Sequence, residues 1–162
     1  MATKLTKQQA EALLSAYQKQ QTDAAKASIA AYNQTVDADT AATEAEIQAE
    51  QGAVHATADA AVDRAAIQAL IERREIAETL SNLGLSRSGT AASARESIDR
   101  KQAIAARGAN AVKAKALSSL SQKLVTAREQ AAAKKEKNTA TVNKTLQGKI
   151  AEKKLTLDKA AL

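Results

Sequence analysis

Residues 80–93, LSNLGLSRSGTAAS, form the one stretch of the sequence in which helix-breaking residues gather. The long segments on either side lack proline, are rich in alanine and space their apolar residues as helices do. Gly84 fits the left-handed position just past the end of a helix, because glycine has no Cβ to clash there. Leu85 then takes the position whose side chain packs back onto Leu80 in a Schellman ending. The stretch therefore predicts a turn between two long helices.

The second helix has two candidate N-terminal caps. Thr90 or Ser93 can accept a hydrogen bond from the first free N–H groups, and Ser93 with Glu96 spells S-x-x-E, a capping box. We expect the turn at residues 83–90, within an elbow at residues 82–92. The elbow residues singled out are Gly84, Leu85, Gly89 and Ser93.

Composition limits what the two helices can build. The chain has no Pro, Cys, Trp or Phe, and alanine supplies most of its 44% hydrophobic content. Large apolar side chains are too few for a close-packed globular interior, whereas alanine is the best helix former. We therefore expect an all-α fold, a long antiparallel helical hairpin resembling a coiled coil. Residues 1–162 would form one elongated helical unit, with a first arm at 5–82 and a second arm at 91–158.

Each arm carries a helical stripe of apolar residues. In the first arm, steps of 7 and 11 residues predict a nearly straight, weakly supercoiled helix, and in the second arm the steps are mostly 4 and 7, which is again helical spacing. The first stripe is predicted at Leu14, Tyr17, Ile29, Tyr32, Val36, Ile47, Val54, Val62, Ile67, Leu70, Ile76, Leu80 and Leu83. The second is predicted at Ile98, Ala105, Val112, Ala116, Leu120, Leu124, Ala127, Ala131, Val142, Leu146, Ile150 and Leu157.

A helix break is also predicted in the first arm, near residues 33–42. Asn, Thr, Val and Asp gather there, and all are mediocre helix formers. Thr43 and Glu46 could restart the helix as a second capping box.

Charge divides the chain at the elbow. Residues 1–83 carry a net charge of −5 and residues 84–162 a net charge of +11. Such asymmetry is typical of nucleic-acid binding, but the two arms could equally be partners for each other. A fold at the elbow places residue i across from residue 172 − i, so that the acidic stretch 37–63 faces basic residues of the second arm. The expected inter-arm charges are Asp37, Glu44, Glu46, Glu50, Asp59, Asp63, Lys113, Lys115, Lys123, Arg128, Lys134 and Lys135.

No residue pattern predicts catalysis, a metal or a cofactor. His55 is the one histidine, and without cysteine or a second histidine it is interpreted as a surface or seam residue. The carboxylates of Asp37 and Asp39 are two positions apart, as are those of Glu44 and Glu46, so neither pair shares a helix face. We therefore expect no enzyme and no cofactor.

Nucleic-acid and membrane binding are the remaining classes. The second arm is basic but has no interleaved aromatics for base stacking, so DNA binding would be sequence-independent contact with phosphates. A membrane surface is a poorer partner, because the faces are mostly alanine. No apolar run is long enough to span a bilayer, and the N-terminus lacks the apolar core of a secretory signal. We expect cytoplasmic synthesis of a soluble product.

The hinge residues Asn82-Leu83-Gly84-Leu85-Ser86-Arg87-Ser88-Gly89, within the block 72–108, carry a family resemblance. The block resembles a recurrent element of small, Ala- and Gln-rich helical virion proteins of tailed bacteriophages, with a hinge of the type N-L-G-L-[ST]-x-S-G. The resemblance implies a structural part of the particle, in the neck, the tail or the internal core beneath the portal. It implies no catalytic residue.

Two functional expectations follow. The first is a non-enzymatic virion structural protein that forms homo-oligomers and contacts other virion proteins such as portal, adaptor or tail components. The alternative is an ejection-type protein whose basic second arm contacts DNA phosphates or a membrane surface during genome delivery.

Overall fold

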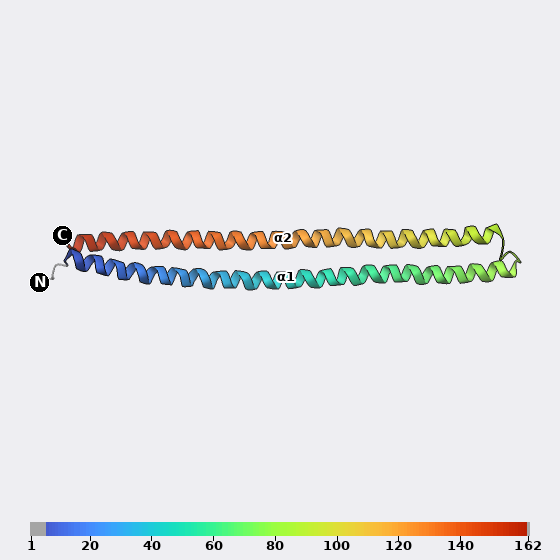
Figure 1. Ribbon diagram of the computed structural model, residues 1–162, viewed down its shortest axis with the longest axis horizontal. Helices are drawn as coiled ribbons and strands as arrows, with labels where there is room; N and C mark the ends of the chain where they lie inside the picture. Colours follow the sequence, from blue (N-terminus) through green and yellow to red (C-terminus); the bar gives the residue numbers. More distant parts are fainter. Residues whose placement is uncertain (1–5, 162) are drawn as a thin grey trace. The chain divides into compact units, whose positions relative to one another are not determined.

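The computed structural model describes residues 6–161, which contain two helices and no strand. Helix α1 spans Lys7–Asn82 and helix α2 spans Gly89–Ala161. The two helices pack against each other in opposite directions (Figure 1), so the predicted all-α helical hairpin is confirmed. The predicted start of the first arm, Leu5, lies outside the described residues.

Helix α1 begins with a capping box that the sequence contains but that was not predicted. The N–H of Thr6 donates to Oε1 of Gln9 at 3.0 Å, and the N–H of Gln9 donates to Oγ1 of Thr6 at 3.3 Å. This reciprocal pair satisfies donors that the first turn of a helix leaves free. The T-x-x-Q pattern at residues 6–9 was a sufficient sequence signal for it.

The predicted break near residues 33–42 is wrong, because α1 continues through it. The hydroxyls of Thr35, Thr40 and Thr43 donate to carbonyls four residues earlier, at 3.2, 2.7 and 3.0 Å. Thr43 is therefore an interior helix residue and not a cap. Val36, in the middle of the stretch, is only 7% exposed, and this packing outweighs the weak helix propensity of its neighbours.

The end of α1 is a complete Schellman motif, as predicted. Gly84 has φ of +70°, and its N–H donates to the carbonyl of Ser81 at 3.1 Å. The N–H of Leu85 donates to the carbonyl of Leu80 at 2.8 Å. These two bonds satisfy carbonyls at the helix end that have no partner inside the helix.

The start of α2 differs from the prediction. Neither Thr90 nor Ser93 is the cap; Ser88 is, and its Oγ accepts from the N–H of Ala91 at 3.4 Å while donating to the carbonyl of Leu85 at 2.6 Å. The Schellman ending brings the carbonyl of Leu85 within reach of the Ser88 hydroxyl. The cap therefore lies at Ser88, before the predicted positions Thr90 and Ser93. The helix therefore begins at Gly89, two residues before the predicted arm, and ends at Ala161, three residues after it.

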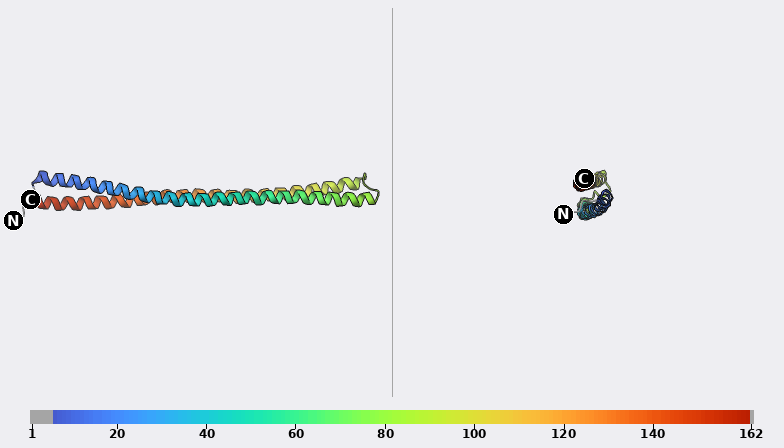
Figure 2. Two further views of the ribbon diagram at one scale, coloured as in Figure 1. Left: turned by 90° about the horizontal axis from the view of Figure 1, so that it is seen from below. Right: turned by 90° about the vertical axis from the view of Figure 1, so that its left-hand side faces the viewer.

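The packing falls into two compact units. The turn unit comprises Glu44–Leu124, and the terminal unit comprises the described residues 6–43 and 125–161. Each unit contains a segment of α1 beside a segment of α2 (Figures 1 and 2). The two units are defined by which segments pack together. The prediction that residues 1–162 form one elongated unit stays a prediction.

In the turn unit the buried face of α1 has a constant spacing of eleven residues. Ile47, Ala58, Ala69 and Leu80 are 6, 7, 4 and 8% exposed. Eleven residues make three turns of 3.67 residues, close to the natural helix, so this seam stays nearly parallel to the helix axis. Two of the four positions are alanine, and the helices meet through small side chains there.

The predicted stripes are partly wrong. Ile67, Leu70 and Leu83 are 58, 61 and 64% exposed, and Val112 in the other helix is 70% exposed. The large apolar side chains of these residues led us to expect them between the helices. The eleven-residue spacing instead places Ala69 in the seam, between exposed Ile67 and exposed Leu70. The consequence is an unusual distribution, with alanines inside and several large apolar side chains outside.

Candidate assembly surfaces

Ion pairs join the two helices in the register 172 − i. In the turn unit Nζ of Lys113 lies 3.1 Å from Oδ1 of Asp59, and Nζ of Lys123 lies 3.8 Å from Oε2 of Glu50. In the terminal unit Lys135 pairs with Asp37. Three of the predicted acidic residues are therefore joined to three of the predicted lysines, at positions whose numbers sum to 172 or 173.

Other predicted charges lie outside these pairs. Glu46, Asp63, Lys115 and Lys134 are exposed, and none has an ion pair within 4.0 Å among the described residues. Glu44 and Arg128 each interact with a partner. These placements divide the set into charges that act between the helices and charges that face solvent.

Two further inter-helix pairs lie beside the turn and were not predicted. An Nη of Arg73 lies 2.5 Å from Oδ1 of Asp99, and Nζ of Lys101 lies 3.6 Å from Oε2 of Glu72. The register 172 − i, extended to the turn, would have found both. In the terminal unit Nζ of Lys153 also lies 5.6 Å from the ring centroid of Tyr17, a cation–π contact between the helices.

These pairs set the register more than they stabilise the fold. Most of their side chains are more than half exposed, and an exposed ion pair contributes about 0–1 kcal/mol. Lys113 is the most enclosed, with 22% of its side chain exposed. If one helix shifted along the other by several residues, the carboxylates of α1 would no longer lie opposite the lysines of α2.

One polar pair in the seam of the terminal unit is not satisfied. Oδ1 of Asn33 and Nδ2 of Asn138 are buried and have no hydrogen-bond partner within the described part of the chain. The register 172 − i places residue 139 across from Asn33, so Asn138 lies one position from it. A buried polar atom without a partner costs free energy, so these two atoms are a local weakness of the seam.

The turn unit contains an apolar groove, which we call the groove. It has a volume of about 580 Å³ and is lined by α1 residues between Ala53 and Ala61 and by α2 residues between Ala105 and Ala116. Its floor includes buried Ala58, and exposed Val112 stands on its α2 side. Alanine, glycine, threonine and valine dominate the lining, so the groove offers shape and apolar contact and no acid–base group apart from Lys113.

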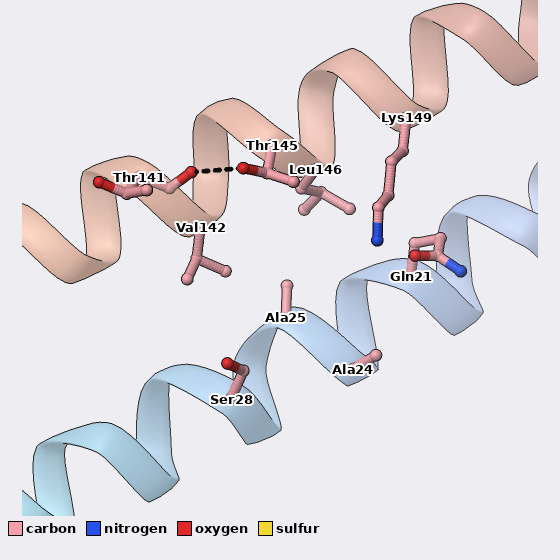
Figure 3. A pocket seen from close by; sticks show the side chains of 9 residues that line it. All are labelled: Gln21, Ala24, Ala25, Ser28, Thr141, Val142, Thr145, Leu146 and Lys149. Atoms are coloured by element: carbon pink, nitrogen blue, oxygen red, sulfur yellow. Dashed lines mark hydrogen bonds between the residues drawn. The ribbon is translucent and has the colours of Figure 1, made fainter.

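The terminal unit contains a smaller cavity of about 250 Å³ (Figure 3). Val142 and Leu146 extend from α2 toward Ala25 on α1, and Lys149 extends toward Gln21. The hydroxyl of Thr145 donates to the carbonyl of Thr141 at 3.0 Å. The lining of this cavity includes no carboxylate and no imidazole, and Lys149 is its one charged side chain.

Large apolar side chains gather on the outside of α1 in the turn unit. Ile67, Leu70 and Ile71 are 58, 61 and 46% exposed and occupy positions i, i+3 and i+4 of one helix, which makes them neighbours. We call these three residues the ridge. Exposed apolar patches of this kind mark interaction sites more often than single exposed residues do.

The remaining candidates have simple placements. His55 is exposed on α1. Within residues 6–161, no three histidine or carboxylate side chains lie close enough together to hold a metal ion. In the same range no helix has the length and hydrophobicity needed to cross a membrane.

Comparison with protein-family models, curated proteins and solved structures finds no match to this chain. The groove, the ridge and the charged faces are therefore the observations on which its function has to be argued.

Proposed function

We propose that this protein is a non-enzymatic structural component of a tailed-bacteriophage particle, a helical hairpin that assembles with copies of itself in the neck, tail or internal core. The observation that carries the proposal is how little of the chain is buried. Ten apolar side chains are buried among the described residues, and none of them is less than 2% exposed. A two-helix layer with so thin a seam is suited to being part of a larger assembly.

The accessible surface supports the same conclusion. It amounts to 11,894 Å² for a chain of 16.9 kDa. A compact monomer of that mass exposes about 7,700 Å² by the usual scaling of surface with mass. The excess surface is available for contacts with other chains. The hinge resemblance at residues 82–89 supplies the setting, a phage particle whose other proteins, such as portal, adaptor or tail components, would be the partners.

Two measurements test the proposal. Mass spectrometry of purified particles should find the chain in a fixed copy number per particle, and sedimentation of the isolated protein should show more than one copy per complex. A chain missing from particles, or a stable monomer at all concentrations, would contradict it.

A second candidate function is an ejection-type protein that contacts DNA phosphates or a membrane surface during genome delivery. The observation that favours DNA is the basic half of the chain, in which Lys115 and Lys134 are exposed and without an ion pair among the described residues. Binding to random duplex DNA would then weaken steeply with salt, with a slope close to the number of phosphates contacted. No binding at low salt would remove this candidate.

A further inference from the structure

The two units carry different net charges. The turn unit contains 11 Lys and Arg side chains against 10 Asp and Glu, a net charge of +1. The described residues of the terminal unit contain 12 Lys and Arg against 8 Asp and Glu, a net charge of +4. In the turn unit the carboxylates of α1 therefore offset the basic charge of α2, whereas in the terminal unit an excess of positive charge remains.

This excess lies on one part of the α2 surface in the terminal unit. Measured against the seam, side chains advance by about 98° per residue, because eleven residues make three turns. Val142 and Leu146 mark the direction of α1 (Figure 3). Five exposed lysines lie about 50–180° from that direction, on one side and on the back of the helix. We call them the lysine face: Lys134, Lys137, Lys144, Lys149 and Lys159.

The carboxylates of the same segment lie mainly on the other side of the helix. Glu129, Glu136 and Asp158 are exposed at about 115–150° from the direction of α1, in the opposite sense, with Lys154 closer to the seam on that side. Glu152 is the one carboxylate of residues 125–161 that falls on the lysine face. This segment of α2 therefore has a positive side and a negative side.

The α1 helix does not neutralise the lysine face. None of its five lysines has an ion pair within 4.0 Å among the described residues. Across the cavity from Lys149, α1 presents only Gln21, Ser28 and two alanines (Figure 3). Asp39 borders the same shallow hollow as Lys134, but no ion pair within 4.0 Å joins them. The ammonium groups are therefore available to an anion from outside the chain.

The chemistry of the lysine face favours a nucleic-acid backbone as that anion. Lysine binds phosphate as a flexible point charge, whereas protein interfaces are enriched in Arg and aromatic residues and depleted in Lys. A membrane-surface helix needs several bulky apolar side chains, and Leu155 is the one large apolar residue exposed on the back of this segment among the described residues. From Lys134 to Lys159 is 25 residues, about 38 Å of helix and close to one turn of duplex DNA.

We propose that the lysine face binds the phosphate backbone of duplex nucleic acid without regard to sequence. The inference rests on the second candidate under the proposed function and deepens it, because it names the contacting residues and confines them to the terminal unit. Lys115, which is also exposed and unpaired among the described residues, lies in the turn unit and outside the face. Five phosphate contacts would give a slope of about −4.5 for the logarithm of the binding constant against the logarithm of salt concentration.

The test uses the full chain and measures fluorescence anisotropy of a labelled random-sequence DNA duplex between about 50 and 200 mM NaCl. Replacing Lys137, Lys144 and Lys149 together by glutamine should reduce the magnitude of the slope by about 2.7. The matched control replaces Arg95, Arg107 and Lys115 by glutamine. These three side chains are also on α2, exposed and without an ion pair among the described residues.

The control removes the same charge from the turn unit, and its slope should equal that of the wild type. Glutamine is a helix former of about the same strength as lysine and arginine, so both triple variants should keep the helical circular-dichroism signal. Equal reductions of the slope in the two triple variants would show that net charge alone governs binding, and would overturn the inference while the second candidate stands.

A second pair of variants adds charge and removes no lysine. Glu152→Lys lies on the lysine face and Glu136→Lys lies on the opposite side, and both change the net charge by the same amount. Glu152→Lys should bind the duplex more tightly and increase the magnitude of the slope by about 0.9, the value for one further phosphate. Glu136→Lys should leave the slope unchanged. The same increase in both variants, or a larger one in Glu136→Lys, contradicts the placement of the site.

The remaining outcomes separate this inference from the proposed function. No binding of the wild type to duplex DNA at about 50 mM NaCl removes the inference together with the second candidate. The structural role in the particle is unaffected by that result, because it is tested by particle composition and by sedimentation. Binding to vesicles that contain phosphatidylserine, without binding to the duplex, also overturns the inference and identifies a membrane surface as the partner.

Discussion

Replacement of Gly84 by alanine tests how the turn is specified. Gly84 has φ of +70°, the left-handed region in which a Cβ clashes with the following carbonyl oxygen. A Cβ added at this position meets no atom of the surroundings within 4 Å, so the backbone conformation is the only source of cost. That cost is about 1–2 kcal/mol for an L-residue. We therefore expect Gly84→Ala to lower the free energy of unfolding by about 1 kcal/mol or slightly more.

The other glycines provide controls with the opposite sign. Gly52 and Gly148 lie inside α1 and α2, have no positive φ and have open space where a Cβ would be added. Alanine there should raise the free energy of unfolding by about 0.5–1 kcal/mol, because glycine is a poor helix former. Gly84→Asn should lie between Gly84→Ala and the wild type, because asparagine tolerates the left-handed region better than alanine.

Urea unfolding followed by far-ultraviolet circular dichroism measures these differences. With a slope of about 2 kcal/mol per molar urea, a loss of 1 kcal/mol lowers the midpoint by about 0.5 M. The slope should stay constant across the series. A midpoint for Gly84→Ala at or above that of the wild type would refute the assignment of the turn to this backbone conformation. Equal losses in all three alanine variants would do the same.

Three other changes test the seam. Ile98→Ala should cost about 2–4 kcal/mol, since Ile98 is 2% exposed and alanine leaves a cavity; a loss below about 1 kcal/mol in urea unfolding would show that the seam is loose there. Asp59→Lys and Lys113→Asp should each lower stability, and the double variant should recover part of the loss, with a coupling of about 0.2–1 kcal/mol in a double-mutant cycle; additive losses, which mean a coupling of zero, would contradict the pairing. Leucine at both Asn33 and Asn138 should raise the urea midpoint by removing two buried amide atoms without partners, each costing about 1–3 kcal/mol, whereas a lower midpoint would mean that these atoms are satisfied in solution.

The turn and the register could be predicted because each depends on local or pairwise rules. Gly84 is the one glycine with the neighbours of a Schellman ending, and a turn at that point fixes which residues face each other across the hairpin. The observed pair between Lys113 and Asp59 follows from that arithmetic. The sequence also carried the signal for the cap at Thr6, in the T-x-x-Q pattern of residues 6–9.

The unbroken α1 helix and the alanine seam depend on how side chains pack, and composition and hydrophobicity alone do not predict that packing. The stretch around Val36 has weak helix formers, but burial of Val36 and hydroxyl bonds of its threonines keep α1 continuous. The seam passes through Ala58 and Ala69, whereas hydrophobicity alone favours Ile67 and Leu70 for it. The groove and the ridge result from the same arrangement, and so neither could be predicted from the hydrophobic pattern.

The eleven-residue spacing of Ile47, Ala58, Ala69 and Leu80 has a consequence for how length can vary. Removing one such period from α1 and the matching period from α2, for example residues 48–58 and 114–124, would shorten the turn unit by about 16 Å and leave every remaining side chain on its original face. A deletion of two or five residues would instead rotate everything beyond it. The helices of this hairpin can therefore be shortened or lengthened by eleven residues at a time without changing which side chains face the other helix. Chains with longer or shorter helices could share one pattern of contacts.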